Sequence, residues 1–382
     1  MKNTTLAIAI AVAGALAVPA AGYAQSSVTI SGLLKGGFEG LKYSGRAVGN
    51  NSQTGVVDDL SRIIFNVVED LGGGLQAIGQ YEFRGTLDTG ALTAAGNDHV
   101  GLRSKTWGRI IFGRQDLHWF VRPSDMTSKA SIRTDVVSIL SYAGGGGQVI
   151  ASGARTANVV HYTTPNWGGF SAIVAYSSNS GGQDADLGLA GRKGRAWNLN
   201  PSYQAGNWQL AYSYWNTKND LGTAANTIAG GDQRSDRLSG YYRFGMGLKL
   251  GLAYDSSRIK GAFGGTTLSK RSAWSLPVEY SWGPHNLYFH YDRASRDKSA
   301  ATDAGSVQAL NGDADSRATM WALAYAYDLS KRTSVALSYA RINNRAGAAY
   351  GFFTSATNGL GNVPVANGED PSMWGVTLRH QF

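Results

Sequence analysis

Three arginines in the first third of the chain could together attract an anion. Arg62, Arg84 and Arg103 each lie in a segment where apolar and polar residues alternate, and each falls on the polar face. A guanidinium stays charged at every physiological pH and donates several hydrogen bonds. If the three segments are neighbouring strands, their polar faces form one surface, because alternate side chains of a strand point the same way. The alternation therefore predicts a basic wall built from consecutive strands.

A long segment that follows these strands, residues 115–155, carries charges that could face such a wall. It shows no strand pattern, and long connections without regular structure are usually functional. Its charged residues include both signs, among them Asp116, Arg122, Asp125, Lys129, Arg133 and Asp135. Aspartates facing the three arginines would set up a transverse field that orients dipolar solutes as they pass.

The chain shows none of the residue patterns that catalysis or metal binding would need. It has no cysteine, and its six histidines form no HExxH motif. No GxSxG elbow occurs, and the glycine run 144–147 lacks the Lys and Ser/Thr of a phosphate loop. The nearest catalytic candidate, 290–295, alternates like an ordinary strand end. We therefore predict no enzymatic activity, no catalytic residue, no metal and no cofactor.

The net charge of +9 does not indicate a nucleic-acid partner. The basic residues are scattered singly, and their densest cluster, 191–195, fits a short solvated loop. The acidic stretches at 311–316 and 368–370 also fit solvated loops better than sites for divalent ions. We expect no nucleic acid among the partners of this protein.

The first 24 residues have the three parts of a secretory signal peptide. A cationic start at Lys2 precedes an apolar run from Leu6 to Val18, and small residues end at Ala24. The apolar run is too short to cross a bilayer as a helix. We predict cleavage after Ala24, which leaves residues 25–382 as the mature chain. Because Lys2 is lost, the net charge falls from +9 to about +8, and the protein is expected to be exported.

Alternation of apolar and polar residues recurs along the whole mature chain, whereas helical periodicity is nearly absent. In the segment 75–84, for example, Leu75, Tyr81 and Phe83 fall on one face and Glu82 on the other. Short turns rich in Gly, Pro, Asn and Asp alternate with longer connections. Counting around these turns gives sixteen strands, with expected spans of 28–43, 60–70, 74–85, 97–105, 107–115, 156–164, 169–177, 194–204, 207–217, 233–243, 247–257, 270–281, 286–293, 316–328, 332–343 and 372–382.

Sixteen up-and-down strands with alternating short and long connections match an outer-membrane barrel better than a soluble β-sandwich. Only a closed sheet leaves no backbone group unpaired in lipid. Aromatic residues at strand ends would form girdles at the membrane interfaces; they include Trp107, Trp167, Trp208, Tyr214 and Trp282. The predicted fold is all-β, a 16-stranded antiparallel transmembrane β-barrel with short periplasmic turns and long extracellular loops. Its polar face would line an aqueous lumen.

Three stretches together resemble the general porins of Gram-negative bacteria, in their β-proteobacterial form. They are the mature start QSSVTISGLLKGGFEG, the hairpin RTANVVHYTTPNWGGF and the terminal strand WGVTLRHQF. The likeness covers the whole mature chain, although the connections at 294–315 and 344–371 are longer. It implies trimers of sixteen-stranded barrels that pass small hydrophilic solutes. It also implies that the third long connection, 115–155, folds inward and narrows the barrel opposite a ladder of arginines.

The residues and the resemblance together predict an outer-membrane porin, a water-filled channel for passive diffusion of small hydrophilic solutes and ions. The basic wall predicts a mild preference for anions. Expected partners are two further copies in a homotrimer, outer-membrane lipid and lipopolysaccharide, and the outer-membrane assembly machinery. The expected location is the Gram-negative outer membrane, after export through the inner membrane. Two alternatives stay open, a barrel that acts mainly as an adhesin or receptor and a substrate-selective channel.

The chain ends on an aromatic residue, Phe382, in a strand that alternates to its last position. Trp374, Val376 and Leu378 fall on the same face as Phe382. This strand must pair with the first one to close a barrel, so its end is not free to fray. In the resembled family the terminal aromatic is the address that the assembly machinery reads. We therefore predict that Phe382 is a closure and assembly signal.

Overall fold

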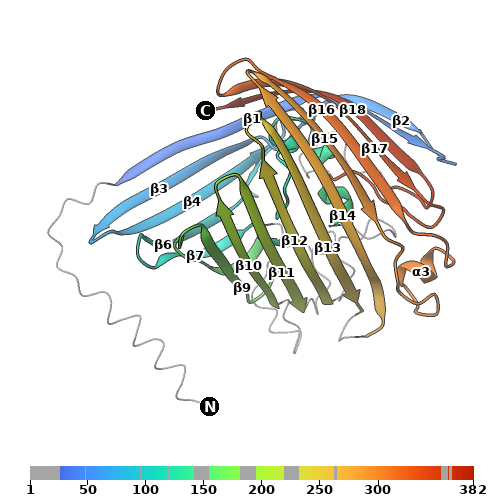
Figure 1. Cartoon of the computed structure of the whole chain (residues 1–382), viewed down its shortest axis with the longest axis horizontal. Coiled ribbons are helices and arrows are strands. Elements are labelled where there is room, and N and C mark those ends of the chain that lie inside the picture. The colour runs from blue at the N-terminus through green and yellow to red at the C-terminus, as the bar shows by residue number, and fades with distance from the viewer. Residues whose placement is uncertain are drawn as a thin grey trace, which may run out of the picture.

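One antiparallel sheet, curved into a ring of tilted strands, makes up most of the structure (Figure 1). No helix in the described ranges is long and apolar enough to cross a membrane. The predicted signal peptide, 1–24, and the glycine run 144–147 lie outside these ranges. The computed structural model describes residues 26–47, 49–94, 96–118, 121–141, 155–180, 195–218, 232–261, 265–353, 360 and 364–382.

Eighteen strand segments form the sheet, and they correspond to sixteen strands of the ring. Segments β2 and β3 follow one another along β1, and β5 and β6 follow one another along β4, so each pair is one interrupted strand. The segments are β1 (Ser27–Ser44), β2 (Ser52–Asp58), β3 (Arg62–Gly72), β4 (Leu75–Gly85), β5 (Leu92–Ala94), β6 (Asp98–Ser104), β7 (Gly108–Gln115), β8 (Thr156–Thr163), β9 (Phe170–Ser177), β10 (Arg195–Ala205), β11 (Trp208–Lys218), β12 (Asp232–Arg243), β13 (Leu248–Lys260), β14 (Thr267–Trp282), β15 (His285–Ala294), β16 (Ala318–Asp328), β17 (Thr333–Asn344) and β18 (Asp370–Gln381).

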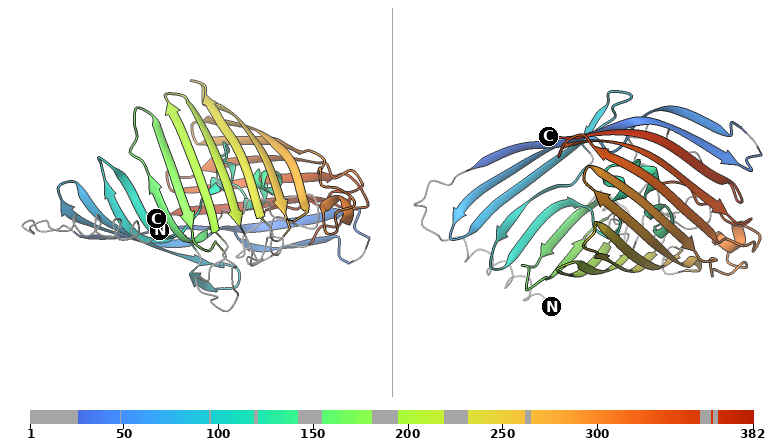
Figure 2. Two further views of the ribbon diagram at one scale, coloured as in Figure 1. Left: turned by 90° about the horizontal axis from the view of Figure 1, so that it is seen from below. Right: turned by 45° about the horizontal axis from the view of Figure 1, so that its top comes forward.

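The first and last strands close the ring. Strand β1 pairs with β18 from Leu33, opposite Gln381, to the far end of both strands, and Figure 2 shows the blue and red strands side by side. Beyond this ladder, the Phe382 N–H donates to the Gly32 carbonyl at 3.2 Å, and the Gly32 N–H donates back at 3.0 Å. Phe382 is 41% exposed. The last residue of the chain therefore belongs to the closing seam.

Side chains alternate between an apolar outer face and a polar inner face. On β13, Leu250, Leu252 and Tyr254 are exposed, whereas Lys249 and Asp255 are buried inside the ring. This distribution is the reverse of that in a water-soluble protein, where large apolar side chains avoid the surface. It suits a barrel whose outer face contacts lipid and whose inner face contacts water.

Exposed tryptophans mark the short-turn end of the barrel. Trp107, Trp167, Trp208 and Trp282 all lie at short turns, and each is between 36% and 56% exposed. Tyr214 lies on the same face of β11 as Trp208, farther toward the long-connection end. Amphipathic aromatic rings are favourable where lipid meets water. The tryptophans therefore occupy the positions expected of a girdle at one membrane interface.

Two long connections are shorter than the alternation predicts. The sequence predicts a loop at 44–59, whereas Ser52–Asp58 form β2 and pair with β1. Strand β13 runs on to Lys260, and β14 begins at Thr267, within the loop expected at 258–269. These strand ends extend past the apolar band, where both faces meet polar surroundings. They therefore lack the alternation by which a membrane strand is identified.

The closing seam depends on glycines at which the two strands approach closely. A Cβ atom added at Gly37 would lie 1.9 Å from the carbonyl oxygen of Val376. We predict that G37A destabilises the barrel by about 1–3 kcal/mol, the usual cost of overpacking, and lowers the temperature at which the folded form is lost in gel-shift melting. G245A is the matched control, because nothing lies within 4 Å of the added atom. Equal melting temperatures of the two variants would contradict the prediction.

Candidate functional site

The connection between β7 and β8 folds into the ring of strands. Three short helical turns, η3 (Met126–Ser128), η4 (Ile132–Thr134) and α2 (Val137–Leu140), lie inside the barrel (Figures 1 and 2). Their residues contact inward-facing side chains from widely separated strands. We call the described part of this connection, residues 116–118 and 121–141, the inner loop.

Charged groups of β1 and its neighbour hold one side of the inner loop. The Lys35 ammonium donates to the Ala130 carbonyl at 2.6 Å and pairs with Asp59 at 2.9 Å. The Arg133 guanidinium pairs with the Glu39 carboxylate at 2.9 Å. All four charged side chains are at most 2% exposed. A buried charge is tolerated only when it is paired, so these contacts fix both the loop and the charges.

Two arginines on the far side of the ring hold the other end of the inner loop. Arg237 of β12 and Arg271 of β14 donate to the Leu140 carbonyl at 3.2 Å and 2.9 Å. This carbonyl belongs to the last turn of α2, whose final C=O groups have no partner within the helix. Arg237 also pairs with Asp255 of β13 at 2.8 Å. The loop backbone is therefore hydrogen-bonded by side chains of the barrel wall.

His118 links the start of the inner loop to β11 and β12. Its Nδ1 lies 2.8 Å from the Ser213 Oγ, and its Nε2 lies 2.9 Å from the Ser235 Oγ. Burial, helped by the nearby positive charge of Arg237, lowers the pKa of His118 to about 4. The imidazole is therefore neutral at physiological pH, with one ring nitrogen donating and the other accepting.

Two further loop residues, Asp125 and Lys129, form ion pairs with the strands at the edge of the inner loop, nearer to water. Lys249 pairs with Asp125 at 2.7 Å and with Glu279 at 3.1 Å. Lys129 pairs with Asp328 of β16 at 2.7 Å. The side chain of Asp125 is 62% exposed, so solvent screens its charge. Exposed pairs contribute less to stability than the buried ones on β1.

Alanines on β16 and β17 let the inner loop lie close to one arc of the wall. Ile139 and Leu140 are fully buried in an apolar cluster with Ala322 and Ala340, which point into the ring. Small side chains on the wall leave room for the larger ones on the loop, so the two surfaces interlock. The loop therefore packs directly against this side of the lumen.

The last long connection packs onto the inner loop as well. Tyr350 and Phe352 are buried in the same apolar cluster, and the Phe353 N–H donates to the Ser138 Oγ at 2.8 Å. Residues 350–353, in the connection that follows β17, therefore pack against α2. This contact adds bulk on the side of the lumen that the inner loop already occupies.

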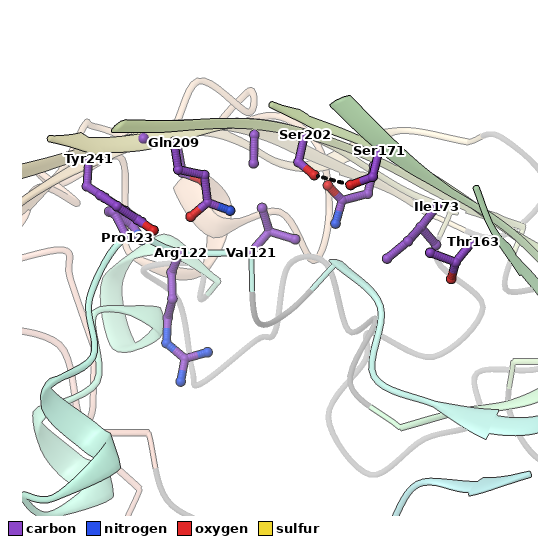
Figure 3. Close-up of a pocket in the computed structure, with 13 residues that line it drawn as sticks. Val121, Arg122, Pro123, Thr163, Ser171, Ile173, Ser202, Gln209 and Tyr241 are labelled. Atoms are coloured by element: carbon purple, nitrogen blue, oxygen red, sulfur yellow. Dashed lines mark hydrogen bonds between the residues drawn. The ribbon is translucent and has the colours of Figure 1, made fainter. Parts of the chain in front are cut away.

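A polar cavity of about 250 Å³ lies between the inner loop and strands β8 to β12 (Figure 3). Val121 and Pro123 form its loop side, while Arg122 points away from the strands toward Asp135, with which it pairs at 2.9 Å. The strand side carries mostly hydroxyl and amide groups. They belong to Thr163, Ser171, Asn200, Ser202, Gln209, Ser239 and Tyr241. Such a surface can exchange hydrogen bonds with water and with small hydrophilic solutes.

Arg62 and Arg84 lie directly opposite each other on β3 and β4 and point inward. Glu82 pairs with Arg84 at 2.5 Å and lies 4.0 Å from Arg62. The Arg62 side chain is 31% exposed, whereas that of Arg84 is 6% exposed. The two predicted residues therefore come together, and Arg62 presents the more accessible charge.

Arg103 lies apart from these two arginines. It is opposite Gln76 on β4 and donates to the Gln76 Oε1 at 2.7 Å and 3.0 Å. Gln76 and Arg84 are separated by roughly 26 Å of strand, at about 3.3 Å per residue. Arg103 therefore lies near the short-turn mouth. Arg379 of β18 is closer to Arg62, since the two flank neighbouring inward positions of β1.

The charged residues predicted within 115–155 take part in several separate contacts. Asp116 accepts hydrogen bonds from the Asn97 side chain at 3.0 Å and from the Arg155 N–H at 2.8 Å. Arg122 and Asp135 pair with each other. The other three, Asp125, Lys129 and Arg133, bind the strands as described above. Asp125, Lys129 and Arg133 therefore anchor the inner loop to the strands, whereas Arg122 and Asp135 join two parts of the loop itself.

Sequence reasoning missed the strand residues that hold the inner loop, namely Lys35, Glu39, Arg237, Asp255 and Arg271. Alternation alone places four of the five on the inner face, since each of these four is next to an exposed apolar residue; these neighbours are Leu34, Phe38, Leu238 and Tyr254. The alternation does not tell which inward residue touches a loop, because that contact joins segments about a hundred residues apart or more. A charge inside an otherwise regular membrane strand is the signal that could have found them.

A model of the Gram-negative porin family matches residues 7–347 of the chain. The chain belongs to this family. The porin is 29% identical to an outer membrane porin protein of Bordetella pertussis, with all of both chains covered. It is 27% identical to outer membrane porin protein 32 of Delftia acidovorans, again with all of both chains covered.

Solved structures share the fold of the porin. An anion-selective porin from Comamonas acidovorans superposes with a TM-score of 0.71 at 22% identity, covering 94% of this chain and 100% of that one. OmpT of Vibrio cholerae in its trimer form superposes with a TM-score of 0.64 at 17% identity, and the superposition covers 94% of this chain and 99% of that one. The predicted 16-stranded antiparallel barrel is thus confirmed. The family and its relatives confirm a diffusion channel in the Gram-negative outer membrane and favour it over the receptor alternative.

The buried Glu39–Arg133 pair generates a test of how the porin holds its inner loop. R133M leaves Glu39 buried without this partner, and breaking a buried pair costs about 3–5 kcal/mol. We predict a lower unfolding temperature and noisier single-channel current, because the loop is released. K129M is the control, since its partly exposed pair with Asp328 is worth about 1 kcal/mol or less. If R133M and K129M behave alike, the buried pair does not hold the loop.

Proposed function

We propose that the porin passes small hydrophilic solutes with a mild preference for anions. The observation that carries this proposal is a pair of inward arginines, Arg62 and Arg84, which lie directly opposite each other on neighbouring strands. They share one carboxylate, that of Glu82, which lies 2.5 Å from Arg84 and 4.0 Å from Arg62. Two positive charges facing one negative charge leave the wall basic. A basic wall raises the local concentration of anions and lowers their barrier to passage. Arg379, across β1 from Arg62, extends this wall.

Residues 115–155 are proposed to be the constriction. The described inner loop occupies one side of the lumen, and the polar cavity beside β8 to β12 remains between loop and wall. The loop charges Asp125 and Arg133 are paired with residues of the wall. The sign of the field in the passage then depends on the unbalanced cations of the strands. Arg103 adds a positive charge near the short-turn mouth.

Two further observations support the anion preference. The mature chain would carry a net charge of about +8, since only Lys2 is lost from the total of +9. A structural neighbour, the porin from Comamonas acidovorans, is described as anion-selective. The preference is mild in this proposal, because Glu82 offsets part of the charge on the wall.

The proposal includes how the protein reaches and assembles in its membrane. Residues 1–24 are removed as a signal peptide, and the mature chain 25–382 forms a homotrimer. The trimer form of OmpT supports this state. In the outer leaflet the trimer contacts lipopolysaccharide. The assembly machinery is proposed to read Phe382, which lies at the closing seam with its side chain partly exposed.

We also propose that the porin has no enzymatic activity. Its family and fold are those of channels. Among the described residues, no group of three or more His, Cys, Asp or Glu side chains is placed to hold a metal ion. The histidine closest to a catalytic pattern, His290, bonds to the Thr134 carbonyl and pairs with Asp292 inside the wall. These contacts support a structural role.

Anion preference is tested by removing charge from the inner wall. At about 6 Å in water, one unit charge changes the energy of a passing ion by roughly 0.7 kcal/mol, or about threefold in permeability. R62Q/R84Q should therefore shift the reversal potential of a planar bilayer in a KCl gradient toward cation preference. R258Q removes a charge from the outer face and serves as the control. The proposal would be contradicted if the reversal potential of R62Q/R84Q equalled that of the wild type, or if R258Q shifted the reversal potential by the same amount.

Deleting Phe382 tests its role in assembly. The deletion removes two backbone hydrogen bonds of the seam and the ring that lies over Gly32. We expect several-fold less folded trimer in the outer membrane, whereas the trimers that do form should conduct normally, because the residue lies outside the lumen. F382Y keeps the aromatic end and should assemble like the wild type. Normal assembly of the deletion variant would show that Phe382 is no signal.

A further inference from the structure

The polar cavity beside the inner loop is hollowed out by a row of small residues on the barrel wall. Ser171, Ser202, Ala211 and Ser239 lie directly opposite one another on four consecutive strands, β9 to β12. All four line the cavity. We call this row the cavity floor. Because its side chains are short, space remains between the floor and the inner loop.

Two amide side chains border the cavity floor. Asn200 on β10 and Gln209 on β11 each lie two positions from the floor residue of the same strand, so they also point inward. Asn200 lies on the long-connection side of the floor and Gln209 on the short-turn side. Among the described residues, neither amide has a hydrogen-bond partner for its side chain. Each therefore offers both donors and an acceptor to a molecule in the cavity.

Ser239 carries a buried hydroxyl that faces the same space. The residue is 5% exposed, and its hydroxyl has no hydrogen-bond partner in the part of the chain that the structure describes. The Oγ atoms of Ser171 and Ser202, by contrast, lie 3.0 Å apart and bond to each other (Figure 3). A buried polar group without a partner costs free energy, so a solute that bonds to Ser239 would relieve this cost.

The side of the cavity that faces the floor is apolar and held in place. Val121 and Pro123 of the inner loop form it, and Ile173 of β9 adds a further apolar side chain (Figure 3). Pro123 packs against β13, since a Cβ atom added at Gly251 would lie 2.9 Å from the Pro123 Cβ. The Val121 N–H donates to the carbonyl of His118 at 3.2 Å. A preformed site loses less entropy when it binds a ligand.

The lining of the cavity presents no unbalanced charge. Among the described residues that form it, only Arg122 is charged, and this side chain points away and pairs within the loop. Two cations lie just beyond the lining. Arg109 donates to the Thr163 Oγ1 at 3.5 Å, and Arg243 donates to the Tyr241 hydroxyl at 2.9 Å. The cavity therefore offers hydrogen bonds rather than charge, unlike the basic wall on β3 and β4.

We propose that this cavity is a binding subsite for neutral polyhydroxylated solutes of monosaccharide size. A sugar hydroxyl both donates and accepts hydrogen bonds, as the hydroxyl and amide groups of the floor and its border do. The C–H face of a sugar ring is apolar and matches the side formed by Val121 and Pro123. This inference deepens the proposed passage of small hydrophilic solutes and rests on it.

The size of the cavity suits one small solute. Its volume of about 250 Å³ is many times the roughly 10–15 Å³ that a single water needs. It lies just below the range of about 300–1,000 Å³ that is typical of pockets for drug-sized ligands. A monosaccharide in this space would contact the floor and the inner loop at the same time.

The test measures uptake of labelled D-glucose into proteoliposomes that contain the purified, folded porin. Four proteins are compared, namely the wild type, S239A, N200L/Q209M and the control N66L/Q80M. Asn66 and Gln80 lie directly opposite each other on the inner face of β3 and β4, so the control removes the same two amides from another arc of the wall. Uptake of D-gluconate, an anion of nearly equal size, is measured in parallel.

Glucose uptake by the wild type should saturate, because each solute occupies the subsite as it passes. A hydrogen bond contributes about twofold to tenfold in affinity. We therefore expect the half-saturating glucose concentration to rise about twofold to tenfold in S239A and about fourfold to a hundredfold in N200L/Q209M. The control should match the wild type. Added KCl should leave the half-saturating concentration unchanged, because salt screens charges and the lining offers none.

S239A guards against a loss of folding, since it removes a single hydroxyl without a described partner. Its melting temperature should equal that of the wild type in a gel-shift assay. N200L/Q209M should leave the uptake of gluconate unchanged. Weaker gluconate uptake in this variant would overturn the assignment to neutral solutes.

The outcomes separate the subsite from the channel. If the wild type conducts KCl but its glucose uptake stays proportional to concentration, the subsite is refuted and the proposed channel function stands. If it passes neither KCl nor glucose, the proposed function fails as well. If N200L/Q209M and the control weaken glucose uptake equally, or if neither S239A nor N200L/Q209M changes it, the cavity is not the site.

Discussion

Lipid offers no hydrogen-bonding partner to a backbone N–H or C=O group, and this constraint shapes the whole molecule. Every strand must pair on both sides, so the sheet has to close, and β1 must meet β18. The closure uses the chain to its last residue, since Phe382 and Gly32 exchange hydrogen bonds beyond the regular ladder. Glycine at position 37 allows the close approach that this seam requires.

In the closed barrel, the distribution of apolar and polar side chains is the reverse of that in a water-soluble protein. The apolar residues face lipid, so the polar and charged residues are left to line the interior. A loop that enters this interior cannot be held by a conventional hydrophobic core alone. The inner loop is instead held by buried ion pairs such as Glu39–Arg133 and by arginines that donate to its carbonyl groups. Apolar packing is confined to the arc where alanines line β16 and β17.

Much of this fold could be predicted from the sequence because lipid imposes a strict period of two. The sixteen strands, the inward direction of Arg62 and Arg84, and the tryptophans at the short turns all follow from that period. The period of two does not identify strands that extend beyond the lipid. For this reason the sequence predicts a loop where the structure has β2. The period of two shows which face of the sheet a residue lies on, but it does not give the position of the residue along the pore axis. Arg103 could therefore be assigned to the inner face but not to its level along the pore.

The contacts of the inner loop could not be predicted, because they join residues far apart in the chain whose pairing no local pattern records. They have a mechanical consequence. The middle of the loop is fastened to β1 and its last helical turn to β12 and β14, on strands far apart around the ring. A cylinder with such a transverse brace resists being flattened into an ellipse. The cross-section of the passage should therefore change little when the lateral pressure of the surrounding membrane changes.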